Sequence, residues 1–278
     1  MLRLSRDRIS IAFCPDRLAG VRTGGLLRPQ VLEKRTIECD SGHGPQLWHG
    51  ALHALRGVAA SLKDDAADVT VVLSNHFVRF SLVPWSGELR HAGDELAMAR
   101  YCFAKVHGER ASQWELRLSR DVAGAPRLAS AIDKDLMDSL LGCFKPGGKA
   151  RLVSVQPYLM AAFNVWRKEI PRDDTWLLLI EPERACIAHI RQGKWSMIRN
   201  TKVEITDARS LLEFLERERS VTEAANDSGK VLVSFAGNPK MALPQSNGWS
   251  FTNLVLPVRP GISPAGDERY AMALCGSW

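Results

Sequence analysis

The strongest constraint on the fold of this 278-residue chain is a short segment that occurs twice. When residue 178 is placed on residue 11, Ile-Ala-Phe-Cys-Pro-Asp-Arg-Leu at 11–18 falls on Leu-Leu-Ile-Glu-Pro-Glu-Arg-Ala at 178–185. Both copies are an apolar run followed by a proline, an acidic residue and an arginine. Self-similarity of this kind indicates a duplicated structural unit. The sequence therefore predicts two related lobes.

The residues that follow each copy predict the same order of elements: a β-hairpin, a third strand, a helix and a fourth strand. Pro15 and Asp16 are typical of a turn between two strands, and apolar residues three and four apart indicate the helices. In the first half the predicted strands cover 8–13, 18–23, 30–38 and 69–73, and the helix covers 46–62. In the second half the predicted strands cover 175–180, 185–190, 195–203 and 230–235, and the helix runs from Thr206 or Asp207 to Arg219.

Further elements lie between the two halves. Asp133 is a good N-cap for a helix that ends at Leu141, and Pro157 suits the first turn of another helix. The remaining predicted elements are strands at 77–83, 114–118, 127–132 and 151–155 and a long helix at 87–106. We therefore expect a first lobe at 1–172 with an inserted subdomain at about 77–132, and a second lobe at 173–278.

A strand-hairpin, strand, helix, strand unit that is used twice resembles the actin-like fold of actin, sugar kinases and heat-shock chaperones. Four segments are similar to the cytoplasmic actin-like proteins of type IV pilus and type II secretion assembly platforms: Ser74–Trp85, Leu89–Gly108, Val153–Leu159 and Tyr270–Gly276. The resemblance implies an α/β, ribonuclease H-like fold with two lobes, each containing a mixed sheet that begins with a β-hairpin meander.

In active members of this superfamily the first hairpin turn of each half carries an Asp-x-Gly phosphate motif. Glycine lets backbone amides approach phosphate oxygens, and the aspartate positions Mg²⁺ or water. Here the two turns are Cys-Pro-Asp-Arg at 14–17 and Glu-Pro-Glu-Arg at 181–184, and both lack the glycine. Proline also removes an amide donor, and the glutamates would repel phosphate.

The positions of a nucleotide cleft can still be assigned, as a degenerate cleft. They are Asp16, Arg17, Glu183, Arg184 and Gly237, where Gly237 stands in place of a glycine-rich adenosine loop. Arg17 and Arg184 could bind phosphate as cations, so ATP with Mg²⁺ stays open as a ligand. We expect no resident cofactor, no catalytic residue and no metal site.

Other motifs have simpler interpretations. Lys-Pro-Gly-Gly-Lys at 145–149 fails the P-loop pattern and is expected to be a basic turn. His49 and His53 lie four apart on a predicted helix, but no acidic residue or cysteine accompanies them, so a metal site is not favoured. Trp85, Trp166, Trp176 and Trp195 are expected to pack in the core rather than to stack on bases.

Composition excludes several classes of protein. The net charge of +6 arises from 37 basic and 31 acidic residues scattered along the chain, which favours a mixed solvated surface over a nucleic-acid interface. No apolar stretch approaches the roughly 20 residues that span a bilayer, and arginines interrupt the N-terminal segment. The six cysteines form no CxxC pair. We expect a cytoplasmic protein, peripheral to the inner membrane and held there by a partner.

The leading functional hypothesis is a non-catalytic scaffold of a pilus or secretion assembly platform. The resemblance implies a partner: the cytoplasmic tail of an inner-membrane protein, lying in a groove of the actin-like body. The alternative is an ATP-binding switch or ATPase of the same fold with non-standard phosphate motifs. A third hypothesis, nucleic-acid binding through the basic surplus, predicts affinity that falls steeply with salt.

Overall fold

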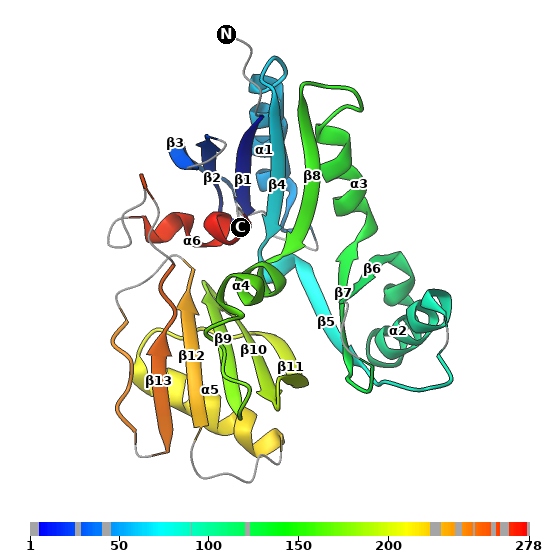
Figure 1. Ribbon diagram of the computed structural model, residues 1–278, viewed down its shortest axis with the longest axis vertical. Coiled ribbons are helices and arrows are strands. Elements are labelled where there is room, and N and C mark those ends of the chain that lie inside the picture. Colours follow the sequence, from blue (N-terminus) through cyan, green and yellow to red (C-terminus); the bar gives the residue numbers. More distant parts are fainter. Residues whose placement is uncertain are drawn as a thin grey trace. The chain divides into compact units, whose positions relative to one another are not determined.

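The computed structural model describes residues 6–25, 29–40, 46–89, 91–119, 123–222, 229–236, 241–246, 248–256, 260–261 and 267–276 (Figure 1). The chain divides into two compact units. Unit 1 contains Met1–Val78, Asp133–Val165 and Leu256–Trp278, and unit 2 contains Arg79–Ile132 and Trp166–Val255. The expected lobes at 1–172 and 173–278 stay a prediction.

Unit 1 is built on a five-stranded mixed sheet. The strand order is β3 (Gln30–Glu38), β2 (Arg17–Gly24), β1 (Asp7–Phe13), β4 (Ala67–Leu73) and β8 (Ala150–Pro157). The first three strands are antiparallel, whereas β4 is parallel to both β1 and β8. Six of the seven residues of β1 are buried, as expected for a central strand that is covered on both faces.

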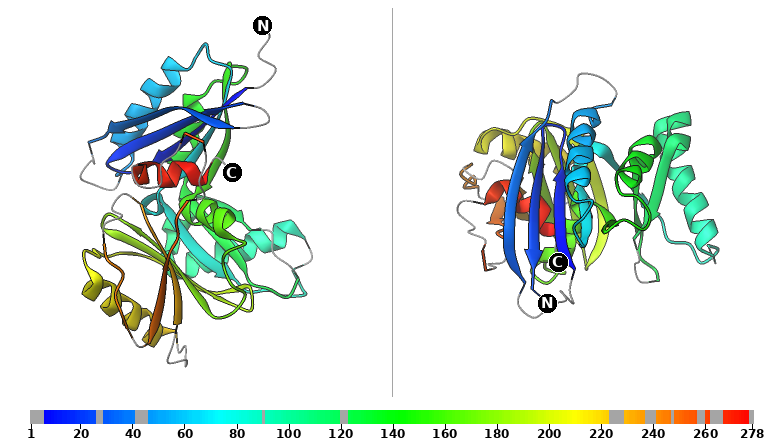
Figure 2. Two further views of the ribbon diagram at one scale, coloured as in Figure 1. Left: turned by 60° about the vertical axis from the view of Figure 1, so that its left-hand side comes forward. Right: turned by 90° about the horizontal axis from the view of Figure 1, so that it is seen from above.

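Helices cover both faces of this sheet. Helices α1 (His49–Ser61) and α6 (Ala271–Cys275) lie on opposite sides of β1 to β3, as the right-hand view of Figure 2 shows. Ile9 and Ile11 of β1 face α1, and the hydroxyl of the intervening Ser10 donates to the carbonyl oxygen of Ala273 in α6 at 2.5 Å. Helix α3 (Lys134–Cys143) packs beside α1.

Unit 2 contains a sheet of the same order and the same strand directions. Its strands are β11 (Lys194–Lys202), β10 (Arg184–Arg191), β9 (Thr175–Glu181), β12 (Gly229–Phe235) and β13 (Trp249–Asn253). Helix α5 (Ala208–Val221) packs Leu211, Phe214 and Leu215 onto this sheet. The predicted duplication and mixed, hairpin-led sheets are thereby confirmed. Strand β13, which pairs with β12 in parallel, was not predicted.

The inserted segment forms a three-stranded sheet with a helix on one face. The strand order is β5 (Val78–Val83), β7 (Arg127–Asp133) and β6 (Trp114–Leu118), and the helix is α2 (Ala92–His107). Ala99 and Phe103 of α2 pack against Trp114 and Leu116. The side chain and backbone of His91 form a capping box with Asp94. The helix therefore begins later than the apolar spacing from residue 87 predicted.

Two local predictions were wrong. Trp166, Trp176 and Trp195 are buried, but the Trp85 side chain is 51% exposed, because it follows Pro84 beyond the end of β5. Pro157 is the last residue of β8 rather than part of a helical turn, and helix α4 (Tyr158–Trp166) begins after it. None of the helices in the described part of the chain is long and apolar enough to span a membrane.

An ion-pair cluster in unit 1 connects β4 with β8 and with the residue that precedes β1. Asp68 of β4 accepts from Arg6 Nε at 2.6 Å and from Nε and Nη2 of Arg151 at 3.1 and 2.8 Å. Partial burial raises the pKa of the Asp68 carboxyl, but hydrogen bonds and charge from Arg151 and Arg6 outweigh it and hold the pKa below its usual value. Folding thus favours the ionised form.

We predict that Asp68→Asn lowers the free energy of unfolding by about 1 kcal/mol near neutral pH. A carboxyl with a depressed pKa stabilises the fold above its unfolded value of about 4, and the contribution is lost as pH falls through the folded pKa. Urea unfolding at several pH values should therefore show the difference from wild type shrinking in acid. Asp64→Asn, at an exposed carboxyl 3.9 Å from Lys149 Nζ, is the control with little effect. A difference that is constant with pH would contradict the assignment.

Candidate functional site

In the first hairpin turn, at residues 14–17, polar groups bind to other groups of the same turn. The Cys14 amide donates to the Arg17 carbonyl oxygen at 3.0 Å, and Pro15 has no amide to offer. The Asp16 carboxylate accepts from Arg17 Nη1 at 2.7 Å, and the Arg17 side chain is only 14% exposed. The structure therefore brings Asp16 and Arg17 together as a local ion pair at the start of β2.

The second hairpin turn, at residues 181–184, has a different backbone. Pro182 is followed by Glu183 with φ of 56°, which is the left-handed conformation that the third residue of a type II turn requires and that favours glycine. Glu181 is buried and Arg184 is half-buried. Burial lowers the pKa of the Arg184 guanidinium, and the Glu181 carboxylate opposes this shift.

Beside the second turn, unit 2 contains a cavity of about 370 Å³. Among the described residues, Glu181, Glu183 and Glu204 contribute carboxylate groups to its lining, and no basic residue does. The rest of the lining is Ile180, Pro182, Ile205, Thr206, Phe235, Ala236 and Met241. Such a wall disfavours phosphate, and among the described residues no group of three potential ligands is placed to hold a metal ion.

The other predicted cleft and motif residues are Gly237, the two histidines of α1 and the segment at 145–149. Gly237 lies outside the described residues. The side chains of His49 and His53 are exposed on α1. The segment at 145–149 is a turn between α3 and β8, with the Gly148 amide donating to the Lys145 carbonyl oxygen at 3.0 Å, as predicted.

Sequence analysis missed a buried histidine in unit 2. His189 stacks on Trp176, with ring centroids 4.3 Å apart, and its Nδ1 and Nε2 lie 2.9 Å from Ser196 Oγ and 3.5 Å from Asp174 Oδ1. Burial lowers the pKa of His189, opposed by the Asp174 carboxylate and supported by Arg191. Ser196 lies opposite the register shift between β10 and β11, so this cluster supports a β-bulge.

Solved structures with the same architecture decide the fold. The "PilM-PilN type IV pilus biogenesis complex" superposes with a TM-score of 0.65 at 13% sequence identity, over 99% of this chain and 98% of the other. The cytoplasmic domain of EpsL, an inner-membrane component of the type II secretion system of Vibrio cholerae, superposes with a TM-score of 0.54 at 11% sequence identity. The match covers 96% of this chain and 94% of the other. A Bacteroides thetaiotaomicron protein with an actin-like ATPase fold and unknown function superposes with a TM-score of 0.57 at 11% sequence identity, over 82% of each chain. The chain has the actin-like ATPase fold.

The predicted actin-like fold, which this chain shares with these solved pilus and secretion structures, is thus confirmed. Neither the protein-family models nor the curated proteins give a match by sequence. The likeness therefore lies in strand order and packing. The residues of the two hairpin turns have to be judged on their own geometry.

We predict that Glu183→Gly raises the free energy of unfolding by about 0.5–1 kcal/mol. Left-handed backbone costs a residue with a Cβ about 1–2 kcal/mol, and the greater freedom of glycine in the unfolded chain offsets part of the gain. Urea unfolding measures the change. Glu183→Ala is the matched control: it removes the exposed ion pair with Lys202, which contributes little, but keeps the strained backbone. If both variants changed stability equally, the backbone explanation would fail.

Proposed function

We propose that this chain is a non-catalytic, actin-like component of a type IV pilus or type II secretion assembly platform, and that it binds the cytoplasmic tail of an inner-membrane protein. One observation carries the proposal: the structural superposition on the PilM-PilN complex, which covers 99% of this chain and 98% of the other. The EpsL cytoplasmic domain supports the same assignment. The protein would lie in the cytoplasm, against the inner membrane.

The chemistry of the hairpin turns supports a role without phosphate transfer. Turn 14–17 offers few free amide donors, and its charges pair with each other. Turn 181–184 adjoins a cavity with three carboxylates in its wall. Phosphoryl transfer depends on donors and cations aimed at the phosphate oxygens, and these two turns provide little of either.

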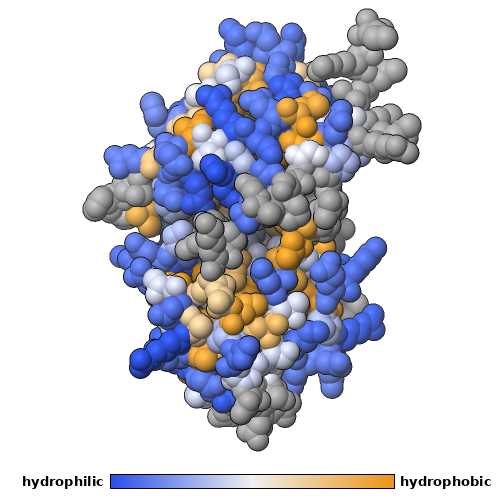
Figure 3. Space-filling model, turned by 90° about the vertical axis from the view of Figure 1, so that its left-hand side faces the viewer, coloured by the Kyte–Doolittle hydropathy of each residue, from blue (hydrophilic) through white to orange (hydrophobic). Residues whose placement is uncertain are grey.

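The surface supports a role in protein binding. Large apolar side chains are exposed on the inserted segment, with Trp85 at 51%, Tyr101 at 63% and Val106 at 72%. On the face drawn in Figure 3, hydrophobic residues lie in small patches between hydrophilic ones. Mixed surfaces of this kind are typical of non-obligate interfaces, and exposed aromatic residues often supply their binding energy.

An ATP-binding switch is the second candidate, and one observation favours it. Arg184 Nε is buried and has no hydrogen-bond partner among the described residues. A buried donor of this kind is costly, and a phosphate oxygen would satisfy it. The opposing observation is the nearby acidic wall, which repels the same phosphate.

Mg-ATP should leave the unfolding temperature unchanged at millimolar concentration. A ligand at about 100 times its dissociation constant would stabilise the folded chain by about 2.7 kcal/mol, which thermal unfolding readily detects. Mg-ADP and Arg184→Ala serve as controls for any shift that appears. A saturable shift with Mg-ATP that Arg184→Ala abolishes would establish the switch instead.

For the partner, co-purification from the native host after cross-linking should recover an inner-membrane pilus or secretion protein. A synthetic peptide of its cytoplasmic tail should then bind the purified chain in fluorescence anisotropy. We expect Trp85→Ala to weaken this binding at least about tenfold, whereas Val221→Ala, at a similarly exposed apolar residue of α5, should not. Recovery of no pilus or secretion protein would overturn the partner assignment.

A further inference from the structure

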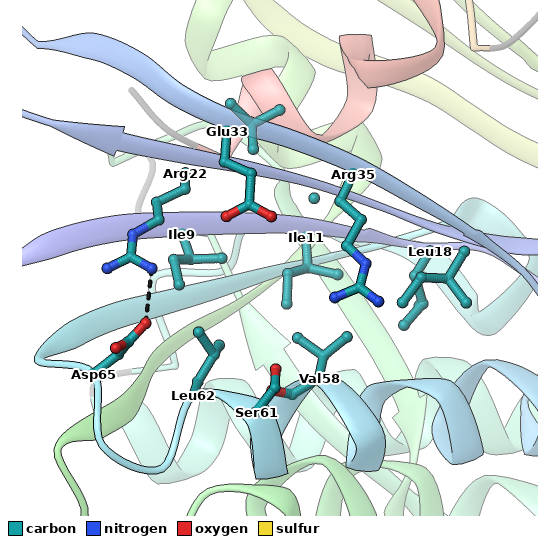
Figure 4. A pocket seen from close by; sticks show the side chains of 13 residues that line it. Ile9, Ile11, Leu18, Arg22, Glu33, Arg35, Val58, Ser61, Leu62 and Asp65 are labelled. Carbon is teal, nitrogen blue, oxygen red and sulfur yellow. Dashed lines mark hydrogen bonds and ion pairs between the residues drawn. The ribbon is translucent and has the colours of Figure 1, made fainter.

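Unit 1 contains a cavity of about 250 Å³ between β1 to β3 and helix α1 (Figure 4). Its walls are mostly aliphatic. They include Ile9, Ile11, Leu18, Ile37, Val58 and Leu62. An apolar cavity of about 150 Å³ already accommodates benzene, so this one has room for a leucine or phenylalanine side chain and its α-carbon.

The cavity is kept open by a glycine in the interior of a strand. Gly20 of β2 pairs with Ile11 on one side and Arg35 on the other. Within 4 Å, a Cβ atom there would meet only the Arg35 carbonyl oxygen, at 3.8 Å, so alanine would fit without a clash. Glycine weakens a strand interior and often marks the close approach of a ligand.

One of the charged residues around the cavity is already neutralised. Arg22 donates through Nε and Nη2 to Asp7 Oδ2 at 2.9 and 2.7 Å, and through Nη1 to Asp65 Oδ2 at 2.7 Å. This cation is saturated by two carboxylates. The three side chains together carry a net charge of −1, so this end of the cavity has no free cation to bind a ligand carboxylate.

The mouth of the cavity carries two further charges of opposite sign. Glu33 and Arg35 project from β3 toward α1 (Figure 4). Both are exposed, and neither forms an ion pair with another residue in the described ranges. Residues two apart in a strand are separated by roughly 7 Å, so an ammonium and a carboxylate group on one carbon atom could sit between them.

We propose that this cavity binds a free α-amino acid with a large aliphatic or aromatic side chain. The ligand carboxylate pairs with the Arg35 guanidinium, its ammonium pairs with the Glu33 carboxylate, and its side chain enters beside Gly20. The proposal is independent of the pilus or secretion assignment. The competing explanation is that the charges on β3 protect an edge strand from pairing. Protection of the edge strand would explain the charges of Glu33 and Arg35. It would not explain why the cavity wall at residue 20 is a glycine with free space beside it.

Titration with L-leucine and L-phenylalanine, followed by calorimetry or amide NMR shifts, tests the proposal on the full chain. Both amino acids should bind saturably. Glycine lacks the side chain, leucinamide lacks the carboxylate and N-acetyl-leucine lacks the ammonium group, so each should bind at least about tenfold more weakly. Failure of both amino acids to bind at about 20 mM, or equal binding of leucine and the three analogues, would overturn the proposal.

Variants assign each contact. Arg35→Gln should no longer distinguish leucine from leucinamide, and Glu33→Gln should no longer distinguish leucine from N-acetyl-leucine. Gly20→Leu should abolish binding by filling the cavity. Gly20→Ala, a single methyl group with space around it, should fold normally and bind more weakly.

Gly57→Ala is the matched control for the glycine substitutions. Gly57 is exposed on α1 with nothing within 4 Å of an added Cβ, so binding should be unchanged. If Gly20→Ala and Gly20→Leu bound leucine as well as Gly57→Ala does, the ligand would lie elsewhere and the proposal would be wrong. The proposal would also be wrong if leucinamide and N-acetyl-leucine still bound more weakly than leucine to both Arg35→Gln and Glu33→Gln.

Discussion

The fold depends on the burial of one central strand in each unit. All seven residues of β9 are buried, and all but Arg8 of β1 are. A strand that is buried along almost its whole length has to be covered on both faces and paired along both edges. In each unit the antiparallel hairpin partner supplies one edge and a parallel strand supplies the other. The order of strand, hairpin and helix in the sequence follows from that requirement.

This requirement explains how much of the fold could be predicted from sequence. Long apolar runs and three-to-four spacing located the central strands, α1 and α5 to within a few residues. Strand β13 was missed because its five residues carry only Trp249 and Phe251 as apolar positions. Helix α2 was predicted to begin too early because Leu89 continues the apolar spacing, whereas the capping box of His91 and Asp94 determines where the helix begins.

The candidate sites were less predictable, because they depend on pairing between side chains that the sequence does not reveal. Sequence analysis identified Asp16 and Arg17, but not that they neutralise each other. It identified Glu183, but not the acidic cavity that Glu204 completes from beyond β11. The role of Gly20 became visible only once the register placed it between Ile11 and Arg35.

The two hairpin turns, which have equivalent places in the two sheets, differ in a way that bears on function. In the first, the largely buried Arg17 side chain pairs with the neighbouring Asp16, and the Cys14 amide closes the hairpin itself. In the second, the half-buried Arg184 stands beside the buried Glu181, and Glu183 has a left-handed backbone conformation that favours glycine. Since hairpin closure needs neither phosphate nor metal, such turns can lose their donor geometry while the sheets stay intact. The unit then keeps its value as a rigid support for surfaces that bind other molecules, which is the role that we propose for this chain.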